Sequence, residues 1–284
     1  MNFLLQILIL GIVQGAAELL PVSSSAHVIV VEKLMGLDPS SPEMTFVLVM
    51  LHTGTMFAVI VYFWNSWRRH YFSSFAQLRA VVLNVILATI LTGFVGYGLQ
   101  LLIEKILLQG RPSTEMESLF SQLPLIAGAL LAVGVLIIIA GLREDRRRGG
   151  TDVLPGSAAV IGAVQGLCLP FRGFSRSGAT ISTGLLVGVG KRRMEEFSFA
   201  LAVVLTPIAI ARELLRLLKS HPEGGSHPLQ LAFPGLVGMI FSFVAGLFAL
   251  LLLSRWLEGG RWQFFGYYCL AAAAIVFALY SFGF

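Results

Sequence analysis

The segment Gly11-Ile12-Val13-Gln14-Gly15 recurs 151 residues later as Gly162-Ala163-Val164-Gln165-Gly166. The features that follow each copy also match at the same or nearly the same spacing: Pro21 and Pro170, the serine-containing turns 23–25 and 175–177, and Phe46 and Phe197. A single match of five residues carries little weight, but several at a nearly constant offset indicate an internal repeat. The chain is therefore predicted to consist of two homologous halves.

Apolar residues dominate the chain around both copies. Of its 284 residues, 56% are hydrophobic and 12% are charged, whereas a soluble domain carries about 25% charged residues. The net charge of +5 comes from short basic clusters between apolar runs, a distribution typical of cytoplasmic loops, so we exclude a nucleic-acid partner. Cys168 and Cys269 lie in apolar segments and are predicted to be small core residues without a disulfide. The chain is predicted to be an integral membrane protein.

The apolar runs and the breaks between them predict ten helices. We expect them at about 2–20, 22–36, 44–64, 81–103, 124–142, 153–169, 175–190, 197–218, 233–254 and 263–283. Six have the roughly 20 apolar residues that a membrane span needs. The first two helices, and the pair within 153–190, are too short or too polar, and each pair is expected to form a re-entrant hairpin.

The predicted fold class is thus an all-α polytopic membrane protein with two inverted-topology repeats. Each repeat, about 1–145 and about 151–284, is expected to contain a re-entrant helix hairpin plus three transmembrane helices within one membrane domain. Three crossings in each half invert the second repeat and place both termini outside. In such folds the binding site lies near the bilayer midplane, so the two serine-containing turns are expected to meet there.

The positive-inside rule agrees with this topology. The loops assigned to the inside carry Arg68, Arg69, Arg79, Arg143, Arg146, Arg147, Arg148, Lys191, Arg192, Arg193, Arg255 and Arg261. The loops assigned to the outside, 37–43, 104–123 and 219–232, carry Lys105, Arg111 and Lys219.

The first turn combines a broken helix with acidic and hydroxyl side chains. Gln14 and Glu18 are four residues apart and share a helix face, and Pro21 ends that helix. The next helix is expected to begin among three serines: Ser23, Ser24 and Ser25. Capping alone explains serines there, although a helix N-terminus also binds anions. A carboxylate in an apolar helix costs about 2.5–3.5 kcal/mol, so we predict a function for Glu18, and also for His27.

The second turn places an arginine among hydroxyl groups. Arg176 lies between apolar helices, and a guanidinium pairs with two phosphate oxygens at once. Gly178 permits close approach of the backbone. Hydroxyl groups that can donate to the same phosphate belong to Ser175, Ser177 and Thr180. For Arg172 an ordinary cytoplasmic-loop role is an equal alternative. No His/Cys metal motif and no nucleotide-binding loop is present, so nucleotide-driven chemistry is not expected.

At these residues the sequence resembles the undecaprenyl-diphosphatase family, the bacitracin-resistance type of polytopic phosphatase. One family motif, E/Q-x-x-x-E followed by P-V-S-S-x-x-H, matches residues 14–27, and another, S-R-S-G-A-T, matches residues 175–180. The resemblance covers essentially the whole chain. It implies hydrolysis of undecaprenyl diphosphate to the monophosphate carrier lipid at the outer face of the bacterial cytoplasmic membrane. That reaction recycles the carrier for cell-wall synthesis and confers bacitracin resistance.

The resemblance also implies roles for single residues. Glu18 and His27 would be acid/base groups, and Glu18 would also assist a divalent cation, Mg²⁺ or Ca²⁺. Ser24 would be the candidate nucleophile and Arg176 the diphosphate clamp. The remaining residues expected to bind the substrate phosphates are Gln14, Ser23, Ser25, Arg172, Ser175, Ser177 and Thr180.

The chain departs from the common family pattern at three places. Gln14 replaces a frequent glutamate, Ala26 replaces a glycine, and Pro170-Phe-Arg-Gly-Phe174 replaces a shorter Pro-Gly-x segment. A glutamine cannot take up a proton, so a mechanism with two carboxylates is in question.

A transporter that flips a polyprenyl phosphate or another anion is the alternative function, because an inverted repeat serves transport equally well. A small-anion channel is a third option. Release of inorganic phosphate separates the enzyme from both. The sequence leaves open whether Ser24 or water is the nucleophile, which metal is used, and the oligomeric state, a homodimer included.

Overall fold

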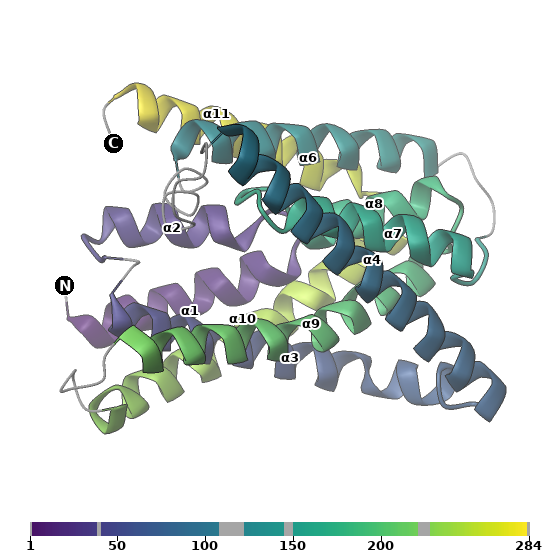
Figure 1. Ribbon diagram of the computed structural model, residues 1–284, viewed down its shortest axis with the longest axis horizontal. Coiled ribbons are helices and arrows are strands. Elements are labelled where there is room, and N and C mark those ends of the chain that lie inside the picture. Colours follow the sequence, from purple (N-terminus) through teal and green to yellow (C-terminus); the bar gives the residue numbers. More distant parts are fainter. Residues whose placement is uncertain (1, 39–40, 108–121, 145–149, 221–227, 283–284) are drawn as a thin grey trace. The chain divides into compact units, whose positions relative to one another are not determined.

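Ten α-helices make up nearly all of the described chain (Figure 1). The computed structural model describes residues 2–38, 41–107, 122–144, 150–220 and 228–282. The helices are α1 (Phe3–Leu19), α2 (Ser24–Leu34), α3 (Pro42–His70), α4 (Phe75–Leu107), α6 (Leu123–Glu144), α7 (Pro155–Cys168), α8 (Arg176–Leu186), α9 (Lys191–Ser220), α10 (Pro228–Glu258) and α11 (Gln263–Ser281). Within these ranges no strand is present, and the predicted all-α polytopic fold class is confirmed.

Six of these helices are long and apolar enough to cross a membrane: α3, α4, α6, α9, α10 and α11. The other four have between 11 and 17 residues. At 1.5 Å per residue, 17 residues extend about 26 Å, which is less than the roughly 30 Å hydrocarbon core. The predicted division into six spanning and four short helices is therefore confirmed. The re-entrant path of the short pairs and the inversion of the second half stay predictions.

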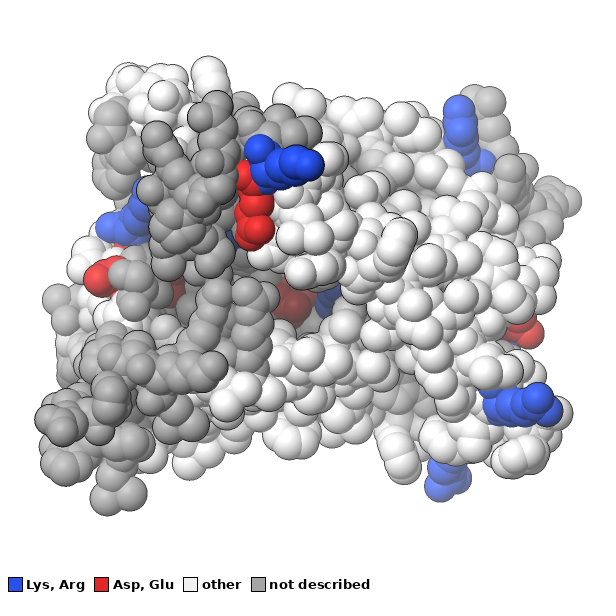
Figure 2. Space-filling view, in the orientation of Figure 1, with Lys and Arg blue, Asp and Glu red and all other residues white. Residues whose placement is uncertain are grey.

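The surface of the spanning helices suits a lipid environment. Large apolar side chains on them are exposed, including Ile90 at 62%, Phe94 at 77% and Phe248 at 68%. Figure 2 shows that, on the face drawn, the described surface is mostly free of charge, with acidic and basic side chains in a few separate places. A contiguous apolar surface of this kind is expected where lipid, not water, is the neighbour. The protein is a multi-pass membrane protein.

Five of the six spanning helices extend beyond their predicted ends, and α11 ends at Ser281, two residues before its predicted end. The third helix was expected to end near residue 64 but continues to His70, and α9 begins at Lys191, six residues before its expected start. The added turns carry charged residues such as Arg69 and Arg192. A hydropathy criterion stops at the first charges, whereas a helical backbone continues into the hydrated interface.

The chain folds into two compact units, and neither is a continuous half of the sequence. The first contains residues 1–20, 24–65 and 202–253, and the second contains residues 21–23, 66–201 and 254–284. Each unit therefore combines segments from both predicted repeats. The boundary between the repeats at about 145–151 stays a prediction, and several basic residues used for the topology, such as Arg111 and Arg146, lie outside the described residues.

In the first unit, the glycines of the recurring segment bring α1 against the backbone of α10. A Cβ placed on Gly11 would lie 2.8 Å from the carbonyl oxygen of Gly238, and one on Gly15 would lie 2.4 Å from that of Ser242. Both distances are shorter than a non-bonded contact between a Cβ and an oxygen atom, so a side chain larger than that of glycine does not fit. The Ser242 hydroxyl in turn donates to the Leu51 carbonyl at 2.9 Å. Small residues spaced in this way allow close helix packing where no hydrophobic effect drives association.

In the second unit, the other copy of the segment brings α7 against α4 in the same manner. A Cβ on Gly162 would lie 2.4 Å from the Ala88 carbonyl oxygen, and one on Gly166 would lie 2.8 Å from that of Thr92. Gln165 donates from Nε2 to the Thr92 hydroxyl at 3.0 Å. The two copies thus have the same packing role, each within its own unit, and the internal repeat itself stays a prediction.

This close packing predicts the effect of a single methyl group. Gly166→Ala places a Cβ against backbone and should lower the stability by about 1–3 kcal/mol, as overpacking does. Gly98→Ala, in the same unit, meets open space and should leave the stability unchanged or raise it by up to about 1 kcal/mol, because alanine favours a helix over glycine. Thermal unfolding of both variants in detergent measures the difference. Equal midpoints would contradict the packing role of Gly166.

Candidate active site

The break between α1 and α2 is built by a proline and a strained serine. After α1 ends, Leu20 takes an extended conformation with ψ 152°, and Pro21 has no N–H to continue the helix. Ser23 has φ 69°, the one positive φ at a non-glycine residue in the described ranges. A left-handed conformation costs a residue with a Cβ about 1–2 kcal/mol. Such strain is found mainly at functional turns.

The turn brings the hydroxyl of Ser24 to the carboxylate of Glu18. Ser24 Oγ donates to Glu18 Oε2 at 2.5 Å, and Gln14 Nε2 donates to the same oxygen at 3.4 Å. Gln14 is buried at 1% exposure, whereas Glu18 and Ser24 are partly buried. A short bond from a hydroxyl to an ionised carboxylate is strong. A hydroxyl directed at a base in this way is the arrangement of an activated nucleophile.

The other predicted residues of this turn lie within three residues of Ser24 in the sequence. His27 is partly buried in α2 and lies three residues after Ser24, so the two side chains share a helix face. Ser25 is partly buried in the first turn of α2, and Ser23 is buried at 5% exposure. Figure 1 shows α1 and α2 as neighbouring helices of one hairpin. The structure thus gathers Gln14, Glu18 and Ser24 directly, with His27 on the face of Ser24.

The break between α7 and α8 holds the arginine motif. Gly173 has φ 99°, and a Cβ there would lie 2.7 Å from the Ile126 carbonyl oxygen, so only glycine fits this position. Ser175 is the N-cap of α8, and its Oγ accepts from the Gly178 N–H at 3.2 Å. Ser175 therefore caps α8, a role that the sequence analysis considered only for the serines of the first turn. Arg172 is exposed, and its role as a phosphate ligand stays a prediction.

Arg176 is partly buried and is held by the start of α9. Its Nη1 donates to the Ser198 carbonyl oxygen at 3.2 Å. Thr180 Oγ1 donates to the Arg176 carbonyl oxygen at 2.8 Å and lies 2.7 Å from Ser198 Oγ. Ser175 Oγ and Ser177 Oγ are 3.4 Å apart. The structure thus brings Ser175, Arg176, Ser177 and Thr180 to one end of α8.

Ser198 was missed by the reading of the sequence. It lies 22 residues after Arg176 within an apolar run, and neither its spacing nor its neighbours form a motif. The repeat singled out only the preceding residue, Phe197, which matches Phe46. A serine at 0% exposure inside an apolar helix is informative only when its hydrogen-bond partners are known.

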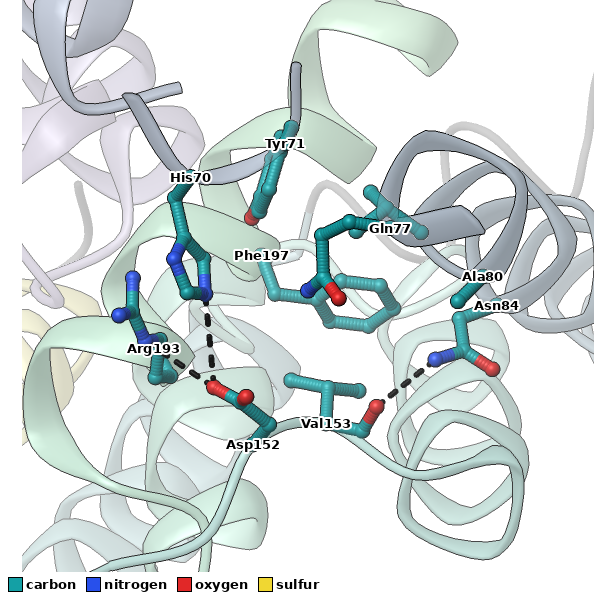
Figure 3. A pocket seen from close by; sticks show the side chains of 10 residues that line it. His70, Tyr71, Gln77, Ala80, Asn84, Asp152, Val153, Arg193 and Phe197 are labelled. Atoms are coloured by element: carbon teal, nitrogen blue, oxygen red, sulfur yellow. Dashed lines mark hydrogen bonds and ion pairs between the residues drawn. The ribbon is translucent and has the colours of Figure 1, made fainter. Parts of the chain in front are cut away.

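A second cluster of charges lies at the head of α9, in a pocket shown in Figure 3. Arg193 Nε pairs with Asp152 at 3.0 Å, and His70 Nε2 lies 3.5 Å from the same carboxylate oxygen. Burial raises the pKa of Tyr71 above its ordinary value, with a further contribution from the charge of Glu196. The full lining is His70, Tyr71, Gln77, Ala80, Val81, Asn84, Asp152, Val153, Arg193 and Phe197. The charges of this pocket are directed at one another, which indicates a structural role.

A divalent cation would have to use few protein ligands. In the described ranges no three His, Cys, Asp or Glu side chains come together as a metal site. Mg²⁺ is nevertheless often bound by one or two carboxylates plus substrate phosphates. Glu18, a carboxylate beside a hydroxyl and an amide, could hold such an ion as a single carboxylate ligand.

These features define a polytopic α-helical membrane protein with two helix breaks, one carrying a carboxylate–hydroxyl pair and the other a guanidinium among hydroxyl groups. The chain belongs to the family of bacitracin resistance protein BacA, whose family model matches residues 7–275.

Relatives of known name agree with this membership. Undecaprenyl-diphosphatase 2 of Acinetobacter baylyi is 58% identical over 280 residues, which cover 97% of this chain and 98% of that protein. Undecaprenyl-diphosphatase of Desulfosudis oleivorans is 33% identical, over 93% of this chain and 94% of its own. Undecaprenyl-diphosphatase 1 of Burkholderia pseudomallei is 34% identical, over 96% of this chain and 95% of that protein.

The strain at Ser23 can be measured with two substitutions. Ser23→Ala and Ser23→Gly both remove the hydroxyl, but only glycine adopts the left-handed conformation freely. The glycine variant should therefore be about 1–2 kcal/mol more stable than the alanine variant. Thermal unfolding in detergent compares them, and an alanine variant as stable as the glycine variant would show that the turn carries no strain.

Proposed function

We propose that this protein hydrolyses undecaprenyl diphosphate to undecaprenyl phosphate and inorganic phosphate, which recycles the carrier lipid for cell-wall synthesis and confers bacitracin resistance. Membership of the BacA family and the 58% identical relative named undecaprenyl-diphosphatase support this proposal. The observation in the structure that carries it is the hydroxyl of Ser24 at 2.5 Å from the carboxylate of Glu18.

In the proposed reaction Ser24 is the nucleophile. Its Oγ attacks the terminal phosphorus while Glu18 takes the hydroxyl proton, a bond forms between Oγ and phosphorus, and the bond from phosphorus to the bridging oxygen breaks. Undecaprenyl phosphate leaves with that oxygen. Water then attacks the phosphoserine, releases inorganic phosphate and restores the hydroxyl, with His27 and Glu18 as the acid/base groups. A direct attack by water, with Ser24 as a hydrogen-bond partner, is the alternative.

Gln14 fits a mechanism with one carboxylate. It exchanges no proton, but its amide donates to the oxygen of Glu18 that also accepts from Ser24. A permanent donor on that oxygen holds the carboxylate in one orientation toward the hydroxyl of Ser24. We therefore assign to Gln14 the orientation of Glu18, in addition to its proposed contact with substrate phosphate.

The arginine motif would bind the diphosphate and stabilise its charge during transfer. Arg176 supplies a fixed positive charge and paired N–H donors, and the N-terminus of α8 adds N–H groups suited to anions. Phosphoryl transfer depends mainly on such positioning and charge stabilisation. The further phosphate ligands in this proposal are Ser23, Ser25, Arg172, Ser175 and Ser177. The hydroxyl of Thr180 was also expected to bind phosphate, but it donates its hydrogen to the Arg176 carbonyl at 2.8 Å, so Thr180 supports the arginine. A Mg²⁺ or Ca²⁺ ion held by Glu18 would neutralise further phosphate charge.

We place the protein in the bacterial cytoplasmic membrane with its active site open to the outer face. The basic loops support this orientation, because cytoplasmic loops carry the excess of arginine and lysine. A homodimer is compatible with the proposal and is tested by the mass of the protein in detergent.

Transport of a polyprenyl phosphate is the second candidate. The matching packing of the two glycine segments is as compatible with transport as with the enzyme, since repeated halves are common in transporters. Only the phosphatase releases inorganic phosphate, so this product distinguishes the two functions.

Phosphate release from undecaprenyl diphosphate by the purified protein, with and without Mg²⁺ or Ca²⁺, tests the proposal. Glu18→Gln should lower the rate about 10²–10⁴-fold, the usual contribution of a general base, and Arg176→Ala should lower it as well. Glu104→Gln is a matched control, because Gln100 donates to Glu104 at 3.3 Å in the same i, i+4 geometry, and it should leave the rate unchanged.

A folded wild-type protein that binds the lipid but releases no phosphate would contradict the enzyme and favour the transporter. A rate lowered equally by Glu18→Gln and Glu104→Gln would contradict the role of Glu18.

A further inference from the structure

The second turn of α9 makes two contacts with the start of α8. The carbonyl oxygen of Ser198 accepts from Arg176 Nη1 at 3.2 Å, and the hydroxyl of Ser198 lies 2.7 Å from that of Thr180. Ser198 and Thr180 are both at 0% exposure. A single residue of α9 thus contacts both the side chain of the arginine and the residue one turn after it.

Counting protons assigns the donors in this cluster. The hydroxyl of Thr180 has one hydrogen, and its carbonyl partner Arg176 at 2.8 Å can only accept; this is the common bond from a helical threonine to the preceding turn. The hydroxyl of Ser198 is therefore the donor to Thr180. The bonds run from Ser198 through Thr180 to the Arg176 carbonyl, and from the Arg176 guanidinium back to the Ser198 carbonyl.

Ser198 is itself held in place by the buried head of α9. Glu196, two residues earlier, is at 0% exposure. Its carboxylate accepts from Ser66 Oγ at 2.5 Å and from Arg193 Nη1 at 3.0 Å, and its carbonyl oxygen accepts from Trp67 Nε1 at 3.3 Å. A buried carboxylate with this many partners is costly to displace, because losing one leaves a charge unpaired. The start of α9 is therefore fixed to the end of α3.

The first turn of α9 also packs on α8. A Cβ on Gly184 would lie 1.8 Å from the sulfur of Met194, so the Met194 side chain occupies the space that the absence of a side chain at Gly184 leaves. α8 cannot shift along α9 without losing this contact. The register that places Ser198 beside Arg176 is thus set by packing as well as by hydrogen bonds.

We propose that Ser198 is a positioning residue that sets the orientation of the Arg176 guanidinium for the substrate diphosphate. This inference rests on the proposed function, in which Arg176 binds that group. The contact with the Ser198 carbonyl uses one of the five N–H donors of a guanidinium and fixes the plane of the fork. Bidentate pairing with phosphate depends on that plane. Ser198 acts through Arg176 and Thr180 and does not touch the substrate.

The test compares Ser198→Ala, Ser198→Thr and Thr180→Val with the wild type. Loss of the Ser198 hydroxyl frees the first turn of α8 and should raise KM for undecaprenyl diphosphate about tenfold, the order expected for one hydrogen bond, with a much smaller change in kcat. Ser198→Thr keeps the hydroxyl and should restore KM. The double variant Ser198→Ala/Thr180→Val should be no worse than either single variant, because the two residues act as one unit.

Ser242→Ala is the matched control. Ser242 is also a serine at 0% exposure in a spanning helix, with its hydroxyl on a backbone carbonyl, so its loss reproduces the general cost of removing a buried hydroxyl. It should leave KM unchanged. Equal KM values for Ser198→Ala and the wild type, or equal increases in Ser198→Ala and Ser242→Ala, would overturn the proposal.

Binding of inorganic pyrophosphate separates this inference from the proposed function. Calorimetric titration needs no turnover, and the dissociation constant should rise about tenfold in Ser198→Ala but not in Ser242→Ala. If the wild type releases no phosphate but this difference in binding persists, the phosphatase function is contradicted and the positioning role of Ser198 is retained. Equal dissociation constants in Ser198→Ala and the wild type would remove the positioning role.

Discussion

The backbone of a membrane protein must satisfy its own polar groups, because the hydrocarbon core offers no water to bond with. An unbroken helix meets this requirement internally. Six of the described helices are long enough for a full span, and among them only α9 and α10 contain an internal proline, Pro207 and Pro234, which removes one backbone hydrogen bond. Four helices are shorter, and every end that lies at membrane depth leaves N–H or carbonyl groups to be bonded by other parts of the protein. The structure meets that demand locally: the hydroxyl of Ser175 bonds the N–H of Gly178 at the start of α8.

The chemistry of the candidate site follows from these helix breaks. A break exposes N–H groups, which attract anions, and it collects small hydroxyl residues as caps. Pro21 and the left-handed Ser23 reverse the chain so that Ser24, the first residue of α2, reaches back to Glu18 in α1. The same turn thus ends α1, begins α2 and brings together the carboxylate and the hydroxyl of the candidate site. Close packing of α1 on α10 through Gly11 and Gly15 holds the helix that carries Glu18.

The sequence predicted most of the fold and part of the site, and the differences have physical reasons. Ten helices were predicted because the length of an apolar run indicates the length of a membrane-spanning helix. The predicted end of α3 and the predicted start of α9 were wrong because both helices continue through charged residues, which a hydropathy criterion takes as the end of a helix. The neighbourhood of Gln14 and Glu18 followed from their spacing of four. The bond from Ser24 to Glu18 did not, because it depends on the φ of Ser23, a conformation that propensities disfavour for serine.

The second motif shows the same limit. Ser175, Arg176, Ser177 and Thr180 are close in sequence and were found together, whereas the contact of Arg176 with Ser198 depends on the packing of α8 on α9. Arg172, only four residues before Arg176, is exposed, whereas Arg176 is partly buried, a difference that their proximity in sequence did not predict. Local spacing predicts contacts within a helix, and contacts between helices require the structure.

In the proposed reaction Glu18 and Ser24 act as one catalytic unit. A double-mutant cycle tests this coupling by measuring kcat/KM for phosphate release from undecaprenyl diphosphate. Glu18→Gln and Ser24→Ala should each lower kcat/KM by about 10²-fold or more, and the double variant should be no slower than the slower single variant, because residues that act as a unit are not additive. Single effects that multiply in the double variant, or a Ser24→Ala variant with full activity, would contradict the account.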